Sequence, residues 1–246
     1  MNHDSPDLSA NRAVAAAAPL LFGVHFLGEL VSLLGPLAGL WWALRHGRFI
    51  LFVAWAVVSV VYVYPLTQLM LIGLLIRCCP KPHSGVQRTT ADAVTYFILA
   101  GLSRGVTTMN CAFWLSCLPY PAHWFYRLAG GRIHPSVFIA FPNVLPDPWN
   151  VEIGRGCILG QGAIVAGHIH VQGRTFVAKT RLGTDVLVGA NAIISGGVQV
   201  GDGARVNPNS FLPPGTRVPP GEVWGGTPAR RCETPSPTES NEKEIE

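Results

Sequence analysis

Aliphatic residues recur at every sixth position through the C-terminal half of the chain. From Leu182 to Trp224 the sequence divides into eight blocks of six residues, each opening on an aliphatic residue or, at the end, on tryptophan. The same period runs through Ile153, Leu159, Val165 and Val171. A six-residue period is typical of a parallel β-helix, in which only the stacking of coils buries the apolar side of each. Three blocks make one three-sided coil, so residues 153–229 predict about four coils, after an irregular one that starts at Ile133.

The period breaks once, between Val171 and Leu182. The next opener would be Val177, but Leu182 follows it after five residues instead of six. We therefore expect residues 172–181, QGRTFVAKTR, to leave the coil as a loop. Binding residues concentrate on loops that a rigid scaffold positions, so this loop marks the first place to look for a site.

Two long apolar segments precede the repeat. Ala13–Leu44 contains one acid and one histidine, and Phe49–Ile76 contains no charged residue. About twenty apolar residues span a bilayer core as a helix, so both segments are long enough. We predict N-terminal transmembrane α-helices, two or more of them, in a membrane domain over residues 13–88 that follows a mobile N-terminus, residues 1–12.

The basic residues around these segments do not fix their orientation. Arg45–Arg48 and Arg77–Arg88 follow the first and second segments, and two spans place them on opposite sides, against the positive-inside rule. Either one segment is a re-entrant hairpin, or residues 93–118 also cross. Arg104 and Asn110 interrupt that region, which favours an amphipathic helix lying on the surface.

Interfacial linker helices are expected over residues 89–132. They end in PYPAHWFYRLAGGR, an aromatic-rich helix that stops at Gly130-Gly131, a common C-terminal glycine signal. The β-helix domain then covers residues 133–232. The tail, residues 233–246, combines low hydrophobicity with Pro, Ser and Glu, which predicts disorder.

The composition departs from that of a soluble domain. Only 13% of residues are charged and 49% are hydrophobic, whereas about a quarter charged is usual. The net charge is +4, but the tail holds five Glu and one Lys, so residues 1–232 carry about +8. Part of this charge flanks the apolar segments, where anionic lipid is the expected partner. No pattern typical of nucleic-acid binding is present. The flanking residues are Arg45, Arg48, Arg77, Lys81 and Arg88.

Ionisable residues inside the first apolar segment are also candidates. His25 and Glu29 are four residues apart and therefore share one helix face. An ionisable residue within a membrane is a functional candidate, and a hydrogen bond between packed helices is the equal alternative. The six cysteines form no CxxC pair and no metal-ligand spacing, and Cys157 fits a small buried slot of the repeat.

Two histidines, His168 and His170, lie in the block just before the break. By register His168 takes the fourth position of its block, an outward corner, and His170 takes the sixth, outward on a wall. A solvated surface imidazole is the ordinary interpretation of such a residue. The neighbouring loop favours a role in a site instead.

Three segments carry a resemblance to a known family: LGQGAIVAGH, LGTDVLVGANAIISGGVQVGDGARV and VWGGTPARR. Residues 126–232 resemble the hexapeptide-repeat acyltransferases, which fold as a left-handed parallel β-helix. They are most similar to the membrane-associated branch and to the C-terminal acyltransferase-like domains of some peptide synthetases. The resemblance implies a homotrimer that binds acyl-CoA in grooves between neighbouring β-helices. It also implies a histidine general base at each groove, His168 first and His170 second.

The resemblance also suggests where coenzyme A would bind. It places Gly189, Ala190 and Asn191 along the pantetheine arm. The nucleotide end of coenzyme A would lie near Asn209, Ser210, Arg230 and Arg231. Adjacent arginines suit phosphates, and a basic cap on the end of the β-helix is the alternative. This sequence departs from the family in NPNSFLPPG, where prolines replace residues that usually offer hydrogen-bonding groups.

The expected reaction is direct transfer of an acyl group, most simply acetyl, from acyl-CoA to a hydroxyl or amine. An imidazole with a pKa near 6.5 can remove the acceptor's proton at neutral pH. Asp147 or Glu152, on the preceding coil, would orient it. The acceptor would be a sugar, a lipid-linked molecule or a peptide, and no metal is expected.

Supply of acyl-CoA implies a β-helix that faces the cytoplasm from an integral membrane location, the plasma or inner membrane in a bacterium. Two alternatives remain. One is a non-catalytic trimeric scaffold anchored in the membrane. The other is a zinc hydratase of the carbonic anhydrase type, which needs three converging histidines where the coils supply His168 and His170 alone.

Overall fold

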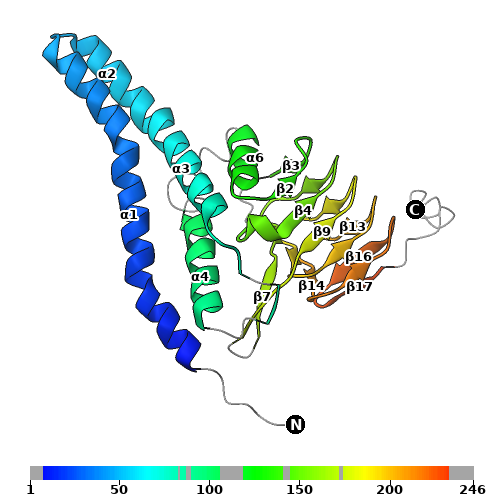
Figure 1. The fold of residues 1–246 in the computed structure, drawn as a ribbon. Helices are drawn as coiled ribbons and strands as arrows, with labels where there is room; N and C mark the ends of the chain where they lie inside the picture. Colours follow the sequence, from blue (N-terminus) through cyan, green and yellow to red (C-terminus); the bar gives the residue numbers. More distant parts are fainter. Residues whose placement is uncertain are drawn as a thin grey trace, which may run out of the picture.

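A computed structural model describes residues 8–82, 84–86, 90–105, 119–140, 145–171 and 174–232. The N-terminal helices lean against one end and one side of a three-sided parallel β-helix (Figure 1). Residues 1–7 and 233–246, which include most of the polar N-terminus and the whole acidic tail, lie outside the described residues.

The first two apolar segments form a helical hairpin (Figure 1). Its arms are α1 (Leu8–Arg45) and a second, continuous arm of α2 (Phe49–Val58), a π-helical turn (Ser59–Val63) and α3 (Tyr64–Cys78). α1 begins at Leu8, earlier than the Ala13 expected. The arms approach closely at Gly39, where a Cβ would overlap the ring of Trp55, and the Trp55 indole N–H donates to the Pro36 carbonyl at 3.1 Å.

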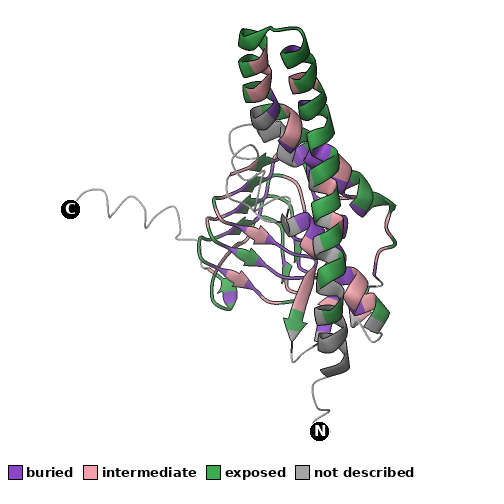
Figure 2. Ribbon diagram, turned by 90° about the vertical axis from the view of Figure 1, so that its left-hand side faces the viewer, coloured by how far each residue is buried: buried purple, intermediate pink, exposed green. Residues whose placement is uncertain are grey.

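The far part of this hairpin exposes apolar side chains, as the green ribbon at the top of Figure 2 shows. Phe26–Arg45 is long and apolar enough to cross a membrane, with 18% of it buried. In the second arm α2 and α3 are each shorter than a span. A core helix of a soluble protein or a signal sequence has the same length and composition, so the two transmembrane helices and the domain boundaries stay predictions.

Two further helices join the hairpin to the β-helix. α4 (Thr90–Gly105) packs against α1 and α3, and it buries Ala93, Tyr96, Leu99 and Leu102 at helical spacing. The helix thus packs within the protein, its expected place at a membrane surface stays a prediction, and residues 106–118 lie outside the described residues. α6 (Pro119–Leu128) ends as predicted, with φ +100° at Gly130 and the Gly131 N–H donating to the Tyr126 carbonyl.

The repeat forms three parallel sheets, which we call the first, second and third walls. The first wall holds β2 (Arg132–Ile133), β4 (Val151–Ile153), β9 (Thr180–Leu182), β12 (Gln199–Val200) and β15 (Arg217–Val218). The second holds β3 (Phe138–Ile139), β5 (Ile158–Leu159), β10 (Leu187–Val188), β13 (Arg205–Val206), β16 (Val223–Gly226) and the antiparallel β17 (Ala229–Arg231). The third holds β6 (Ile164–Val165), β11 (Ile193–Ile194) and β14 (Phe211–Leu212). From β9 onward neighbouring strands of a wall pair 18 residues apart, as Leu187 with Arg205, which confirms the 18-residue coil predicted from the period.

The block openers fill the inside of the coils. Val188, Ile194 and Leu212 are fully buried, and Cys157 occupies its slot at 0% exposure, as predicted. The same core continues without a break into the helices through Ile76, Tyr96, Phe125 and others. The helices and the β-helix are therefore one packed body.

The break in the period is larger than the sequence suggests. Glu152 pairs with Arg181, 29 residues later, so this coil is longer than the first, which repeats after 20, and than those that follow, which repeat after 18. The extra residues form an antiparallel hairpin of β7 (His168–Val171) and β8 (Arg174–Val177), and β1 (Gly85–Val86) pairs with β8. The expected loop over 172–181 is thus wrong at both ends, because the chain leaves the coil at His168 and rejoins the first wall at Thr180. Val171 is not a block opener.

Ile194→Ala should lower the free energy of unfolding by about 2–5 kcal/mol, because it empties a fully buried position. Ile193→Ala, on the same strand but 40% exposed, is the matched control and should cost much less. Urea unfolding followed by circular dichroism measures both. Equal losses would contradict the assignment of inner and outer faces.

Candidate functional site

The hairpin leaves the coil at the corner between the third wall and the first wall. His168 is the first residue of β7, directly after the corner residues Ala166 and Gly167. It is therefore neither on a wall nor at the type of corner expected from its register, where Asp185 and Asn191 adopt positive φ. Asp147 stands at the same corner one coil earlier, just before the 3₁₀ turn Pro148–Asn150.

Asp147 and His168 form a hydrogen-bonded pair. The Asp147 side chain is fully buried, and its Oδ1 lies 3.1 Å from His168 Nδ1 and 3.0 Å from the Gly167 amide N. A carboxylate accepts, so Nδ1–H donates to it and Nε2 keeps its lone pair. The His168 side chain is 17% exposed, which leaves the ring open to a partner. Of the two carboxylates expected to orient His168, the structure selects Asp147.

Two glycines let the backbone of this corner pack without side chains. A Cβ at Gly167 would lie 2.3 Å from Asn150 Cβ and 2.7 Å from Asp147 Oδ2. A Cβ at Gly196, one coil later, would lie 2.7 Å from the His168 amide N. Thr180 links neighbouring coils at the same corner. Its hydroxyl donates to the Ala166 carbonyl at 2.7 Å and accepts from the Gly197 N–H. His168 and Asp147 are therefore held at fixed positions.

Helix α4 covers both histidines. The Tyr96 ring lies 5.0 Å from the His168 ring, and Phe97 stacks on His170 at 5.2 Å and 11°. Burial raises the pKa of Tyr96 well above its usual range, and the charge of Asp147 adds to the shift, so the phenol stays protonated. No local pattern of residues indicates this contact, because α4 is far from the hairpin along the chain.

His170 has a different environment from His168. Its Nδ1 lies 2.9 Å from the Thr175 hydroxyl, and no carboxylate within the described residues pairs with it. Partial desolvation lowers the pKa of His170, and the neighbouring His168, with ring centroids 5.0 Å apart, lowers it further. Of the two, His168 has the geometry of a base held by an acid.

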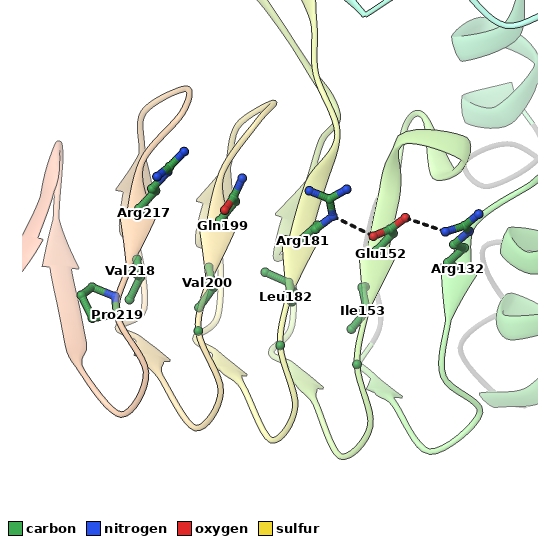
Figure 3. Close-up of a pocket in the computed structure, with 13 residues that line it drawn as sticks. Arg132, Glu152, Ile153, Arg181, Leu182, Gln199, Val200, Arg217, Val218 and Pro219 are labelled. Carbon is green, nitrogen blue, oxygen red and sulfur yellow. Dashed lines mark hydrogen bonds and ion pairs between the residues drawn. The ribbon is translucent and has the colours of Figure 1, made fainter.

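Glu152 belongs to a different feature, a row of charged side chains on the outside of the first wall (Figure 3). It accepts from Lys179 at 2.9 Å and Arg181 at 2.8 Å, and Arg132 lies 3.2 Å away. The hydrogen bond from Lys179, followed by that from Arg181, lowers the pKa of Glu152 despite partial burial. Gln199 and Arg217 continue the row along a shallow hollow of about 570 Å³. This wall is therefore basic, with one carboxylate among four cations.

The residues expected along the pantetheine lie at another corner. Gly189, Ala190 and Asn191 turn the second wall into the third, and Asn209 and Ser210 stack on them one coil later. Asn191 and Asn209 both have positive φ, and the Asn191 amide donates to the Asn209 side chain at 3.4 Å. Ser210 is buried and accepts from the Gly226 N–H at 3.2 Å. Within one chain the third wall separates this corner from the histidines.

The two arginines expected near the nucleotide lie on β17, at the far end of the β-helix (Figure 1). Arg231 pairs with Glu222 at 3.4 Å, and the Arg230 guanidinium donates to the Ala229 carbonyl. Both side chains lie apart from the histidine corner. Their contribution to a coenzyme site stays a prediction.

Within the described part of the chain no group of three His, Cys, Asp or Glu residues could hold a metal ion. The hydrogen bond between His168 and the buried Asp147 has the geometry for acid–base chemistry. The Nε2 atom of His168 can accept a proton from a hydroxyl or amine group, while the buried Asp147 carboxylate balances the charge.

Residues 179–214, from β9 to β14, match the family model described as bacterial transferase hexapeptide (six repeats). A search of the curated proteins found no match.

Several solved structures are similar in fold. A hexapeptide-repeat acetyltransferase from Vibrio cholerae O1 biovar eltor, complexed with acetyl coenzyme A, is 23% identical over 42% of this chain, with a TM-score of 0.33. The alignment covers 62% of that structure, less than two thirds of its length. A second structure of a hexapeptide-repeat acetyltransferase from Vibrio cholerae is 17% identical over 62% of this chain and 96% of that one, with a TM-score of 0.42. A maltose O-acetyltransferase from Clostridium difficile 630 is 18% identical over 46% and 73% of the two chains, with a TM-score of 0.35.

Glu152→Gln should destabilise the protein at neutral pH by on the order of 1 kcal/mol, because its three cationic neighbours lose their counter-charge. The pKa of Glu152 is lower in the folded state than its ordinary 4.5. Its contribution to stability is therefore complete above pH 4.5 and is lost as pH falls through the folded pKa. Urea midpoints of wild type and variant should converge as the pH is lowered.

The matched control for that experiment is Arg217→Gln, which removes a charge from the same wall without breaking an ion pair. It should leave the pH dependence unchanged. A difference between wild type and Glu152→Gln that stays constant with pH would contradict the charge network.

Proposed function

We propose that this protein is an acyl-CoA-dependent acyltransferase with His168 as its general base. The observation that carries the proposal is the hydrogen bond from His168 Nδ1 to the buried Asp147, at the corner where a hairpin interrupts the repeat. The match of residues 179–214 to the hexapeptide transferases supports the reaction class. We infer a left-handed coil and transfer of an acetyl group from the same resemblance.

His168 and Asp147 account for the proton movements of such a transfer. His168 Nε2 takes the proton from the acceptor hydroxyl or amine as its lone pair attacks the thioester carbonyl carbon. The resulting imidazolium donates through Nδ1 to Asp147, which balances its charge. When the carbon–sulfur bond breaks, the imidazolium returns a proton to the leaving thiolate. No covalent enzyme intermediate is required.

A homotrimer would bring the two predicted halves of the site together. The histidine corner and the corner of Gly189–Asn191 lie on either side of the third wall in one chain. A groove between two subunits can combine one chain's His168 with the other chain's coenzyme residues. The basic first wall beside the hairpin would then attract the anionic coenzyme.

We also propose that the helical hairpin inserts into a membrane, with the β-helix on the cytoplasmic side where acyl-CoA is made. Leu27, Leu34 and Trp41 on α1, with Phe49 and Ile50 on α2, expose large apolar side chains that water would not favour. A membrane location favours an acceptor borne on a lipid or in the cell envelope. The similarity to the membrane-associated branch of the family belongs to this proposal.

His168→Ala should lower the rate of acyl transfer by about 10²–10⁴-fold, because the acceptor loses its general base. The measurement is release of free coenzyme A thiol from acetyl-CoA in the presence of crude membrane extract. Asp147→Asn should cause a loss in the same direction, because an amide cannot balance the imidazolium. His134→Ala is the matched control, since His134 is an exposed histidine of the first coil and should be dispensable.

Equal activity in His168→Ala and wild type would eliminate the proposed base. If wild-type protein neither binds nor turns over acyl-CoA, the non-catalytic scaffold replaces the enzyme.

Membrane insertion predicts that the protein stays with the membrane fraction after alkaline carbonate washing. A variant with Cys232 as its sole cysteine should react with an impermeant maleimide only when the cytoplasmic side is accessible. Cys232 lies partly exposed at the end of the β-helix, so the reagent can reach it in the chain described here. Labelling from the outside alone would reverse the proposed topology.

A further inference from the structure

A pocket of about 540 Å³ lies between α3 and α6. None of its lining residues belongs to the histidine site or to the first wall. The lining comprises Met70 and Arg77 of α3, His123, Trp124, Arg127 and Leu128 of α6, and Pro135 of the first coil.

The close approach of the two helices creates this pocket. α3 has Gly73 where α6 packs, and a Cβ there would lie 3.1 Å from Leu128 Cδ2. Met70 and Arg77 flank Gly73 on α3, seven residues apart and therefore about 10 Å apart along the axis. The pocket thus has an apolar part near Met70 and a cationic part near Arg77.

The cationic part carries two charges that no carboxylate among the described residues neutralises. Arg77 and Arg127 are exposed, and neither forms an ion pair with a described residue. No carboxylate is among the residues that line the pocket. Two guanidinium groups at one pocket suit a phosphate, which each can bind through a bidentate contact.

His123 lines the pocket and carries a buried polar atom that has no partner among the described residues. Its Nε2 lies 2.6 Å from the Val137 carbonyl oxygen, so Nε2–H donates and Nδ1 remains an acceptor. Nδ1 is buried and has no partner in the described chain. Burial lowers the pKa of His123, so the ring adds no third positive charge.

The apolar part continues onto the outer face of the helical hairpin. Leu66, Met70 and Leu74 form an exposed stripe at a spacing of four residues along α3, and Trp124 of α6 is 68% exposed beside it. The charge-free segment ends at Ile76, so Arg77 stands where lipid headgroups meet the proposed span. A bilayer lipid could reach the pocket along this stripe.

We propose that this pocket binds one anionic phospholipid, with its phosphate against Arg77 and Arg127 and an acyl chain along Met70, Trp124 and Leu128. The proposal rests on the membrane location proposed above and is independent of transferase activity. A lipid bound here would hold α3 against α6, the helix that leads into the first coil.

Lipid retention by the full-length protein tests the proposal. Purified protein is equilibrated in micelles with equal amounts of phosphatidylglycerol and phosphatidylcholine and analysed by native mass spectrometry. We expect wild type to retain one phosphatidylglycerol per chain. The double variant Arg77→Gln/Arg127→Gln should retain at least about tenfold less, because both contacts to the phosphate are lost.

Two variants serve as controls. Arg45→Gln/Arg48→Gln removes the same charge at the far end of the hairpin and should retain the lipid. Arg77→Lys/Arg127→Lys keeps the charge but loses the bidentate contacts, so its retention should be intermediate, and it remains informative if the Gln variant does not fold.

Four outcomes would overturn the proposal. They are unchanged retention in Arg77→Gln/Arg127→Gln, an equal loss in the control at the hairpin end, equal retention of phosphatidylcholine, and displacement of the lipid by glycerol 3-phosphate at the same concentration. Flotation with liposomes tests the membrane location independently of lipid binding at the pocket. A Gln variant that floats but retains no lipid supports the pocket, whereas wild type that does not float removes the premise and the proposal with it.

Discussion

The structure depends on the stacking of one aliphatic side chain per block along the inside of the β-helix. Most wall strands contain only two or three residues, too few for any pair of strands to be stable alone. Fully buried openers such as Val188, Ile194 and Leu212 supply the missing stabilisation, because each packs on the coil before and after it. Stacking also fixes the corners, and the corner at Gly167 and Gly196 has no room for side chains. His168 follows directly after Gly167, at this tightly packed corner.

The helices and the β-helix share one hydrophobic core, and this makes the histidine site composite. The repeat supplies Asp147 and His168, whereas α4 supplies the rings of Tyr96 and Phe97 that cover the histidines. In the proposed membrane setting, the hairpin fixes the height of this site above the bilayer, because α4 packs on both arms. An acceptor carried by a lipid would then meet the site at a defined distance from the surface.

The sequence predicts the walls well because six-residue spacing is a local property that each strand carries by itself. Prediction from the sequence fails where the same residues fit both the six-residue repeat and another local structure. Val171 fits the repeat by spacing, yet it belongs to a hairpin whose pairing with β8 needs contacts outside the coil. Asp147 and Glu152 are equally plausible partners of His168 along the chain, and only the stacking of coils decides between them. Tyr96 lies 72 residues from His168, and nothing in the spacing of α4 indicates that contact.

The burial of Asp147 explains why its pairing with His168 suits proton transfer. A buried carboxylate is unfavourable unless donors compensate it, and at rest Asp147 has two, both on Oδ1, while Oδ2 has no partner in the described chain. The resting state therefore leaves part of the carboxylate's charge unbalanced. In the proposed reaction His168 takes a proton and forms an ion pair with a fully buried carboxylate, so the attraction is stronger than at the surface. The gain appears only as the proton arrives, which is the condition under which an interaction accelerates a reaction rather than merely tightening binding.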